Sequence, residues 1–456
     1  MRRHPRTRPA RRARLTAVAA VGLTALLGAC TSAGPAPSAS SAITDSADHA
    51  PTTITVWSFH KLPNEVAAFR KSFEDLKRTY PWLTVNFVPN KDDAAFAKAV
   101  AARTPPDVFI SESPDNVGKF CNDGTVTDMN AFLTSAKVDM ATTFPAAILG
   151  YTRYGTKQCA LPLLTDVMTL FYNKKQFAEA GIAGPPRTLS ELTADAKKLT
   201  VRSGDGTVTR FGFMPRSDYN LNVALYGGIY SGSAFYDAQG RSTLGSDPKW
   251  ADLLRWDRDL VSWYGDAQVQ KFVGTYNSHT DDAQNPFATG KASMELLGEW
   301  HVGELAENAP GLDYGVAAFP VLDSVASTYG GGVAAGTVMY LPAGSAHQQE
   351  AFFALQQMAT DTTFLTTLAD LVSNVPTTVA SLQAWDKRTD PHWTPIIDVF
   401  RRTKPSTTAV SPTGTEGTAP WFTFAQSVEL GKVADVPGGL TRVAAQVDAV
   451  TAEAKR

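Results

Sequence analysis

Apolar and polar positions alternate along the chain in a way that predicts strands and helices in turn. Four short β-branched or continuous apolar runs predict strands, namely Thr53–Trp57, Leu83–Val88, Pro106–Ile110 and Val167–Tyr172. After the first run, apolar residues recur at the three- and four-residue spacing of one helix face, at Val66, Phe69, Phe73 and Leu76. Strands followed by helices in this order predict an α/β fold with largely parallel sheets.

Helix-start signals support the same succession of elements. Thr188 and Glu191 have the spacing of a capping box, which predicts a helix through Leu199. Asp247-Pro248 predicts another helix start, because aspartate caps and proline fits the first helical position. Ser345 to Gln348 has the pattern of a second capping box, ahead of a further apolar helix stripe.

The first 29 residues have the pattern of an export signal. Seven arginines precede Leu15, and the apolar run Leu15–Ala29 is shorter than the roughly 20 residues that span a bilayer. The small residues before Cys30 resemble a bacterial lipobox, in which this cysteine becomes the lipidated first residue. An ordinary signal peptide with a chance cysteine is the alternative, and Arg11-Arg12 loosely resembles a twin-arginine signal.

Residues 30–51 are predicted to be the lipidated cysteine and a flexible tether. Thr31–Pro51 is rich in Ser, Ala, Pro and Thr and has too few large apolar residues to form a core. A flexible chain of this length reaches roughly 25 Å. We therefore expect a protein held by a lipid anchor on the extracellular face of the cytoplasmic membrane.

The charge balance argues against nucleic-acid binding. Subtracting the seven N-terminal arginines from the 42 Lys and Arg leaves 35 basic residues against 44 Asp and Glu. A body with this excess of carboxylates is a poor partner for a phosphate backbone.

Two cysteines, Cys121 and Cys159, remain beyond the export signal and the lipobox. An even pair in an exported chain predicts a disulfide, and two buried free thiols are the alternative. Neither has clustered histidines or acids near it in sequence, so we predict no metal site.

A series of short motifs resembles the family 1 extracellular solute-binding proteins of ABC importers, the carbohydrate group that includes maltose-binding protein. The motifs follow the order seen in that family and cover most of residues 52–382: Ile54-Thr55-Val56-Trp57, Pro106-Asp107-Val108, Leu161-Pro162 with Asp166, Tyr172-Asn173-Lys174, Phe287 to Met294, Gly298-Glu299-Trp300, Tyr314-Gly315-Val316 and Gly331-Gly332. Residues 383–456 match mainly through Trp421.

This resemblance implies a two-lobed, periplasmic-binding-protein-like α/β fold with a ligand cleft between the lobes. One lobe would contain residues 52–164 and 335–373, and the other would contain residues 165–334 and 374–456. Three crossover hinge segments would join them, near Pro162–Asp166, Gly331–Gly336 and Leu371–Pro376.

Candidate ligand-binding residues follow from the shape of a sugar, which has C–H faces and a rim of hydroxyls. Aromatic rings suit the faces, and carboxylates suit the rim. By resemblance, Trp300 and Trp421 are the stacking candidates and Asp166 is the cleft carboxylate. A core position is the alternative for both tryptophans, more strongly for Trp421, and a structural aspartate is the alternative for Asp166.

Further candidates lie where predicted strands end. Trp57 ends the first predicted strand and points either into the cleft or into the core. Ser58, Phe59 and His60 follow that strand, and Phe59 and His60 depart from the acidic or amide residues usual in this family. The remaining candidates come after the Pro-Asp-Val strand, in a loop-rich stretch and at a glycine pair: Glu112, Ser113, Tyr219, Tyr226, Gly331 and Gly332. A solvated loop carboxylate is the alternative for Glu112, and a simple turn is the alternative for the glycines.

No catalytic signature accompanies these residues. The seven histidines form no His-Glu-x-x-His, and the chain contains neither a Gly-x-Ser-x-Gly elbow nor a phosphate-binding Gly-x-x-x-x-Gly-Lys. We therefore predict a monomeric, non-enzymatic lipoprotein without cofactor that binds a sugar and delivers it to an ABC permease. The alternatives are a lipid-anchored glycoside hydrolase with two carboxylates and a lipoprotein that binds a polysaccharide or partner without transport.

Overall fold

The computed structural model describes residue 43 and residues 49–215, 228–276, 284–402 and 410–455. The predicted export signal, Cys30, most of the tether, Tyr219 and Tyr226 lie outside these described residues. No helix among the described residues has the length and apolar character needed to cross a membrane.

The elements follow the predicted alternation of strands and helices. The first part of the chain contains β1 (Thr52–Ser58), α1 (Pro63–Thr79), β2 (Leu83–Val88), α2 (Asp93–Ala101), β3 (Val108–Ser111), α3 (Val117–Asn122), α4 (Asn130–Ser135), α5 (Met140–Thr143), α6 (Ala146–Leu149), β4 (Arg153–Tyr154) and β5 (Lys157–Gln158). The middle contains β6 (Leu161–Asn173), α7 (Lys174–Glu179), α8 (Leu189–Leu199), β7 (Val201–Arg202), β8 (Val208–Phe213), α10 (Lys249–Tyr264), α11 (Asp266–Thr275), β9 (Ala292–Leu297), α12 (His301–Asn308) and β10 (Tyr314–Ala317). The last part contains β11 (Val333–Tyr340), α13 (Gln348–Thr360), α14 (Thr362–Val372), β12 (Val375–Pro376), α15 (Val379–Ala384), α16 (Trp393–Arg402), α17 (Ala419–Glu429) and α18 (Val436–Ala454).

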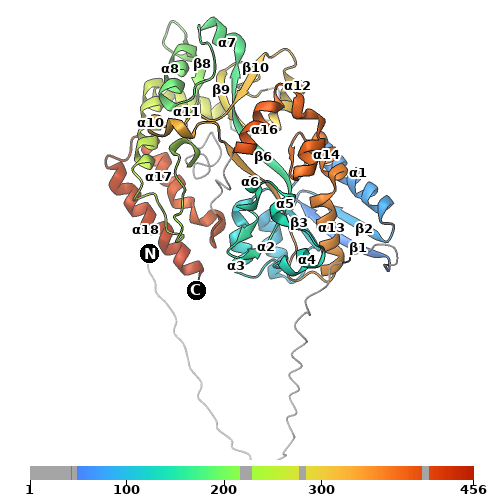
Figure 1. Cartoon of the computed structure of the whole chain (residues 1–456). Helices are drawn as coiled ribbons and strands as arrows, with labels where there is room; N and C mark the ends of the chain where they lie inside the picture. The colour runs from blue at the N-terminus through green and yellow to red at the C-terminus, as the bar shows by residue number, and fades with distance from the viewer. Residues whose placement is uncertain (1–42, 44–48, 216–227, 277–283, 403–409, 456) are drawn as a thin grey trace, which may run out of the picture. The chain divides into compact units, whose positions relative to one another are not determined.

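One sheet runs through the folded region in the order β2-β1-β3-β11-β6-β9-β8-β7, with β10 and β12 also paired to β6. Strand β6 is 13 residues long and connects the end that carries β1 to β3 with the end that carries β8 and β9 (Figure 1). The two ends of the sheet are the frameworks of the two lobes.

The strand directions correct the prediction of largely parallel sheets. Strand β1 is parallel to β2 and β3, and β8 is parallel to β9. Strand β6, in contrast, is antiparallel to β9, β10, β11 and β12. The sheet is mixed because the chain crosses from one end of the sheet to the other and back. Strands that cross in opposite directions pair antiparallel.

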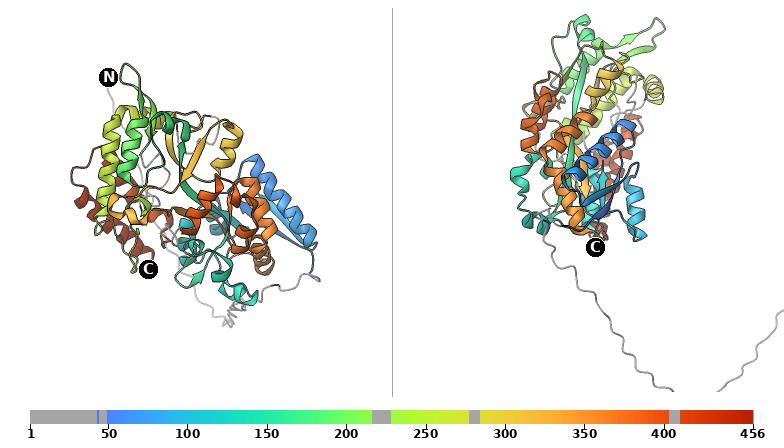
Figure 2. Two further views of the ribbon diagram at one scale, coloured as in Figure 1. Left: turned by 45° about the horizontal axis from the view of Figure 1, so that its top comes forward. Right: turned by 90° about the vertical axis from the view of Figure 1, so that its right-hand side faces the viewer.

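Two hydrophobic clusters stabilise this arrangement. One packs the strands β1 and β3 against helices that include α13 and α14, and contains the stacked pair Phe96 and Phe109, with ring centroids 4.3 Å apart. Helix α1 packs beside α14 (Figures 1 and 2), with Phe69 and Phe73 of the predicted stripe buried. The second cluster packs β8 and β9 against helices that include α8, α10, α17 and α18.

The predicted helix starts meet two different outcomes. Thr188 caps α8 by accepting a hydrogen bond from the Glu191 N–H, while the Glu191 carboxylate accepts from the Arg187 N–H and not from Thr188. Asp247 accepts from the Lys249 N–H, but α10 begins at Lys249 with Pro248, not Asp247, at the N-cap. The capping box expected at Ser345 is absent. Its hydroxyl donates to the Asp107 carboxylate at 2.7 Å instead, and α13 begins at Gln348 without a side-chain cap.

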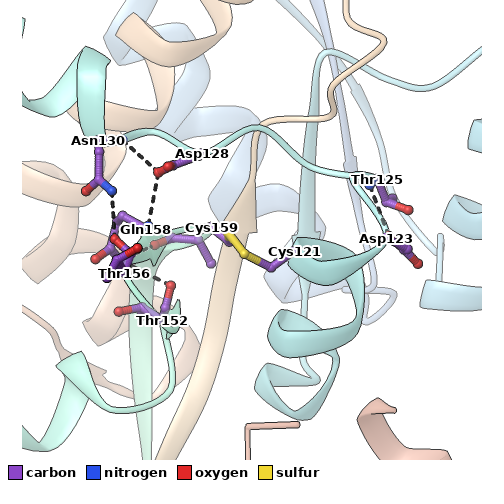
Figure 3. Close-up of a disulfide and its surroundings, with 10 residues drawn as sticks. Cys121, Asp123, Thr125, Asp128, Asn130, Thr152, Thr156, Gln158 and Cys159 are labelled. Atoms are coloured by element: carbon purple, nitrogen blue, oxygen red, sulfur yellow. Dashed lines mark hydrogen bonds between the residues drawn. A yellow bond between two sulfur atoms is a disulfide. The ribbon is translucent and has the colours of Figure 1, made fainter. Parts of the chain in front are cut away.

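A disulfide joins Cys121 of α3 to Cys159, just before β6 (Figure 3). Both residues are buried in the first hydrophobic cluster. Beside the bond, the Asp128 carboxylate accepts hydrogen bonds from the Asn130 and Gln158 N–H groups. The disulfide thus fixes the helical region after β3 to the start of the crossing strand.

Candidate functional site

The candidate site lies where the crossing strands pair. Thr165 of β6 is paired with Gly336 of β11 and with Val375 of β12, so all three predicted crossover segments meet at one level of the sheet. Asp166 is the next residue along β6 and is paired with Ala335. Its position is therefore set by backbone pairing on a strand and not by a loop.

Gly336 allows this close approach of strands. Its φ is +141°, and a Cβ atom at this position would lie 2.6 Å from the Leu164 carbonyl oxygen and 2.8 Å from the Asp166 nitrogen. Gly332, one of the predicted glycines, is buried, and a Cβ there would overlap Val399 and approach the Met168 carbonyl oxygen at 3.0 Å. Gly331 is less crowded, with no atom within 4 Å of such a Cβ.

Asp166 is half-buried and bound on one oxygen. Its Oδ1 accepts a hydrogen bond of 2.9 Å from Asn374 Nδ2. Within the described residues no hydrogen-bond partner reaches Oδ2, so this oxygen remains for another donor. Burial is the main cause that raises the pKa of Asp166, and the negative charge of Glu112 raises it further.

Glu112 follows β3, and its negative charge acts on Asp166. Desolvation by the surrounding chain, followed by the charge of Asp93, raises the pKa of the Glu112 carboxyl. Glu112 is exposed, and Ser113 next to it is half-buried. The predicted carboxylates Asp166 and Glu112 come from two elements, and the charge of Glu112 acts on Asp166.

Trp300, the predicted stacking residue, lies between β9 and α12. It precedes α12 and is half-buried against the second hydrophobic cluster, and its ring packs over Gly298. The residue between them, Glu299, is fully buried, and its Oε2 accepts a hydrogen bond of 2.6 Å from the Val167 N–H. Trp300 therefore follows, in sequence, a residue that binds the backbone next to Asp166.

The candidate residues at the end of β1 and just after it divide between half-buried and buried positions. Trp57 is half-buried, and the Lys91 ammonium lies 5.0 Å from its ring centroid. Ser58 and His60 are buried and are bonded to each other, with Ser58 Oγ 2.8 Å from His60 Nδ1. Burial lowers the pKa of His60 to about 3, so its imidazole is neutral near pH 7. Phe59 is half-buried and packs on the His60 ring.

Trp421 lies in the core of the second cluster. Its side chain is fully buried and meets Trp250 edge to face at 5.1 Å between centroids. Pro420 and Phe424, on the same helix α17, instead line a hollow of about 800 Å³ between α17 and α18. The core alternative fits Trp421 better than a sugar-stacking role, because no ring face is exposed.

Two residues of this site were not among the sequence candidates. Asn374, at the third crossover, donates a hydrogen bond to Asp166, and Glu299 accepts one from the same Asn374 amide. Glu299 had one signal in the sequence, a carboxylate two residues after the end of β9, between Gly298 and Trp300. Asn374 had none, because an asparagine after a helix is also an ordinary terminal residue. Among the described residues, no cluster of histidine, cysteine and acidic side chains is suited to hold a metal ion.

Comparisons with known proteins agree with this architecture. Residues 61–361 match the bacterial extracellular solute-binding protein family. Binding proteins of Brucella abortus (strain 2308) and Brucella suis biovar 1 are each 28% identical over 271 residues, which cover 57% of this chain and 62% of theirs. The match thus spans less than two thirds of the length of these relatives.

Solved structures resemble nearly all of the folded region. CpMnBP1 with mannotriose bound has a TM-score of 0.76 and 24% identity, covering 87% of this chain and 99% of that one. The maltose/maltodextrin-binding domain MalE from Bdellovibrio bacteriovorus bound to maltotriose has a TM-score of 0.68 and 20% identity, again covering 87% and 99%. These similarities establish the two-lobed fold.

Proposed function

The chain belongs to the bacterial extracellular solute-binding protein family, and from this premise we propose that it is the sugar-binding component of an ABC importer. A sugar or oligosaccharide is captured in a cleft between the lobes and is then delivered to the permease in the membrane. Solved relatives of the same fold hold mannotriose and maltotriose, which supports a saccharide as the ligand.

The observation that carries the proposal is the position of Asp166 at the junction of the three crossing segments. One of its oxygens is held by Asn374, and the other has no partner among the described residues. A carboxylate in this position accepts hydrogen bonds from sugar hydroxyls, and charge-assisted bonds of this kind are about twice as strong as neutral ones.

Trp300 supplies the second requirement for binding a sugar. Its ring is half-buried, and packing over Gly298 holds it in place before a ligand arrives. A fixed aromatic face binds the C–H face of a pyranose at low entropic cost. Trp57 and Glu112 on the opposite lobe are the next candidates for contact, and Trp421 is not included because it is buried.

The lobe boundaries form part of the proposal. Residues 52–164 with 335–373 make up one lobe, and residues 165–334 with 374–456 make up the other. The pairing of β6 with β11 and β12 supports crossings at these points. Hinge bending at such crossings closes two lobes around a ligand and excludes water.

We further propose that the protein is a lipoprotein. Residues 1–29 are removed on export, Cys30 carries the lipid, and the following tether holds the binding region near the permease. The family is extracellular, which is consistent with this location. The arrangement keeps the captured sugar close to the transporter.

A saccharide screen tests the function. We expect mannobiose, mannotriose or maltotriose to raise the melting temperature of the purified protein, because a ligand that binds only the folded state stabilises it by mass action. Calorimetry then gives the affinity, and thin-layer chromatography should recover the saccharide unchanged. If no mono- or oligosaccharide raises the melting temperature, the proposal is wrong, and if the saccharide is cleaved, the protein is an enzyme.

A further inference from the structure

Asn374 lies between two carboxylates that come from different elements. It follows α14 and precedes β12, after Ser373, which has the left-handed φ of 55°. Its Nδ2 donates one hydrogen bond to Asp166 Oδ1 at 2.9 Å and another to Glu299 Oε1. A primary amide has two N–H bonds, so both are used in this bridge.

Glu299 completes the arrangement from the opposite side. It is fully buried, and its two oxygens accept from Asn374 Nδ2 and from the Val167 N–H. Asn374 itself is only 9% exposed. The amide therefore has little freedom to rotate, since its acceptor Glu299 is fixed by the backbone of β6.

We propose that Asn374 and Glu299 are positioning residues, which fix one oxygen of Asp166 and leave the other oriented to accept from a ligand hydroxyl. This proposal rests on the proposed function, in which Asp166 contacts a saccharide. Neither residue needs to touch the ligand, because each acts through the carboxylate that it holds in place.

The effect of Asn374 on the pKa of Asp166 makes its positioning role measurable. Glu112, Glu299 and Tyr151 are the titratable groups that interact with Asp166. Burial raises the pKa of Asp166 and of Glu299, whereas the hydrogen bond from Asn374 lowers the pKa of each. Loss of this donor therefore moves the pKa of Asp166 still higher, so the carboxylate form is lost at a higher pH.

A double-mutant cycle tests the proposal, with Asn374→Ala, Asp166→Asn and the double variant titrated with mannotriose by calorimetry between pH 5 and 8. We expect Asn374→Ala to weaken binding roughly tenfold at pH 7, the scale of one hydrogen bond to a charged group. The double variant should bind no more weakly than Asp166→Asn alone. The pH at which affinity is lost should rise in Asn374→Ala.

The exposed Asn130, which donates to the Thr156 carbonyl oxygen, offers a matched control. Asn130→Ala should change neither the affinity nor its pH profile. If Asn374→Ala does not fold, Glu299→Gln replaces it in the cycle, because a glutamine has one acceptor oxygen and cannot accept both N–H bonds. Effects of Asn374 and Asp166 that simply add, or an unchanged pH profile, would overturn the proposal.

A ligand-free measurement separates this proposal from the proposed function. Melting temperatures of the apo variants between pH 5 and 8 report the charges of Asp166 and Glu299 together, and comparison with the same Asn374→Ala change in the Asp166→Asn background isolates the contribution of Asp166. We expect Asn374→Ala to lose stability more steeply than wild type as pH rises. If wild type binds no saccharide, the proposed function fails, and the apo profile still decides whether Asn374 controls Asp166: a steeper loss supports that control and an unchanged slope refutes it.

Discussion

At the scale of single residues, Trp300 offers the clearest test of sugar stacking. Its ring is half-buried and fixed over Gly298, so it presents a preformed surface. We expect Trp300→Ala to weaken saccharide affinity by about 1–3 kcal/mol, the usual contribution of an aromatic anchor. Calorimetry with the best saccharide from the screen measures the effect.

Trp263 is a matched control for this substitution. It is 37% exposed on α10, and Lys197 and Arg202 lie over its ring. Trp263→Ala should leave affinity unchanged. An unaltered affinity in a folded Trp300→Ala variant would remove Trp300 from the site.

Glu112 provides a prediction about the pH dependence of the ligand-free protein. A carboxyl whose pKa is higher in the folded state than in the unfolded state stabilises the fold at low pH. This contribution is lost as pH rises from the unfolded value of ~3.9–4.3 through the raised folded value. Burial raises the pKa of Asp166, and partial desolvation by neighbouring chain raises that of the exposed Glu112. Each is raised further by a neighbouring negative charge.

Glu112→Gln therefore removes one such group and lowers the pKa of Asp166. We expect the melting temperature of the variant to fall less than that of wild type between pH 5 and 8. Glu74→Gln on the exposed side of α1 serves as the control and should follow the wild-type profile. A wild-type slope in Glu112→Gln would show that the two carboxyls are not coupled.

The sequence was most informative about residues whose chemistry has few structural uses. The family resemblance singled out Trp300 after a Gly-x step and Asp166 near a crossover. The structure places Asp166 on a crossing strand, and contact of either residue with a ligand stays a prediction. Trp421 and His60 show the limit, because burial depends on what the rest of the chain packs against them. Asn374 was missed for a related reason, since its partners Asp166 and Glu299 are distant in sequence.

At the scale of elements, Gly336 decides how closely β6 and β11 pack. Its φ is +141°, and a Cβ atom at this position would lie 2.6 Å from the Leu164 carbonyl oxygen, so there is no space for a side chain. We expect Gly336→Ala to reduce the free energy of unfolding by about 1–3 kcal/mol, in the range of backbone strain. Urea denaturation measures this loss.

Gly331, in the same crossover segment, provides a control for the Gly336→Ala substitution. A Cβ at Gly331 would have no atom within 4 Å, so Gly331→Ala should be close to neutral. Equal stability of the two variants would contradict the account of the crossover.

The disulfide gives a second prediction at this scale. Because Cys121 and Cys159 are joined, a thiol reagent should label neither in denatured, unreduced protein in which Cys30 is replaced by serine. Reduction should expose two thiols and destabilise the fold by roughly 3–4 kcal/mol, the entropy scale for a loop of 38 residues. Labelling before reduction would disprove the pairing in solution.

Helices and strands were largely predictable from spacing, as at α1 and β2, because periodicity depends on local burial. Strand direction was less predictable. The antiparallel pairing of β6 with β11 arises from residues more than 160 positions apart, such as Thr165 and Gly336. The lost capping box has the same origin, since the Ser345 hydroxyl binds Asp107 from a distant part of the chain.

At the scale of the whole molecule, the crossing strands are both hinge and binding site in the proposed function. The chain passes between the lobes at β6, β11 and β12, and Asp166, Asn374 and Gly336 all lie at these crossings. A ligand bound to Asp166 and Trp300 would contact both sides of the crossing at once. Binding would then favour the closed form, which is the form that a permease would recognise.

A crystal structure of the protein with its highest-affinity saccharide tests this central claim most directly. The account predicts a sugar hydroxyl within hydrogen-bond distance of Asp166 Oδ2 and a sugar ring stacked on Trp300. A saccharide bound away from both residues, for example in the hollow between α17 and α18, would contradict it.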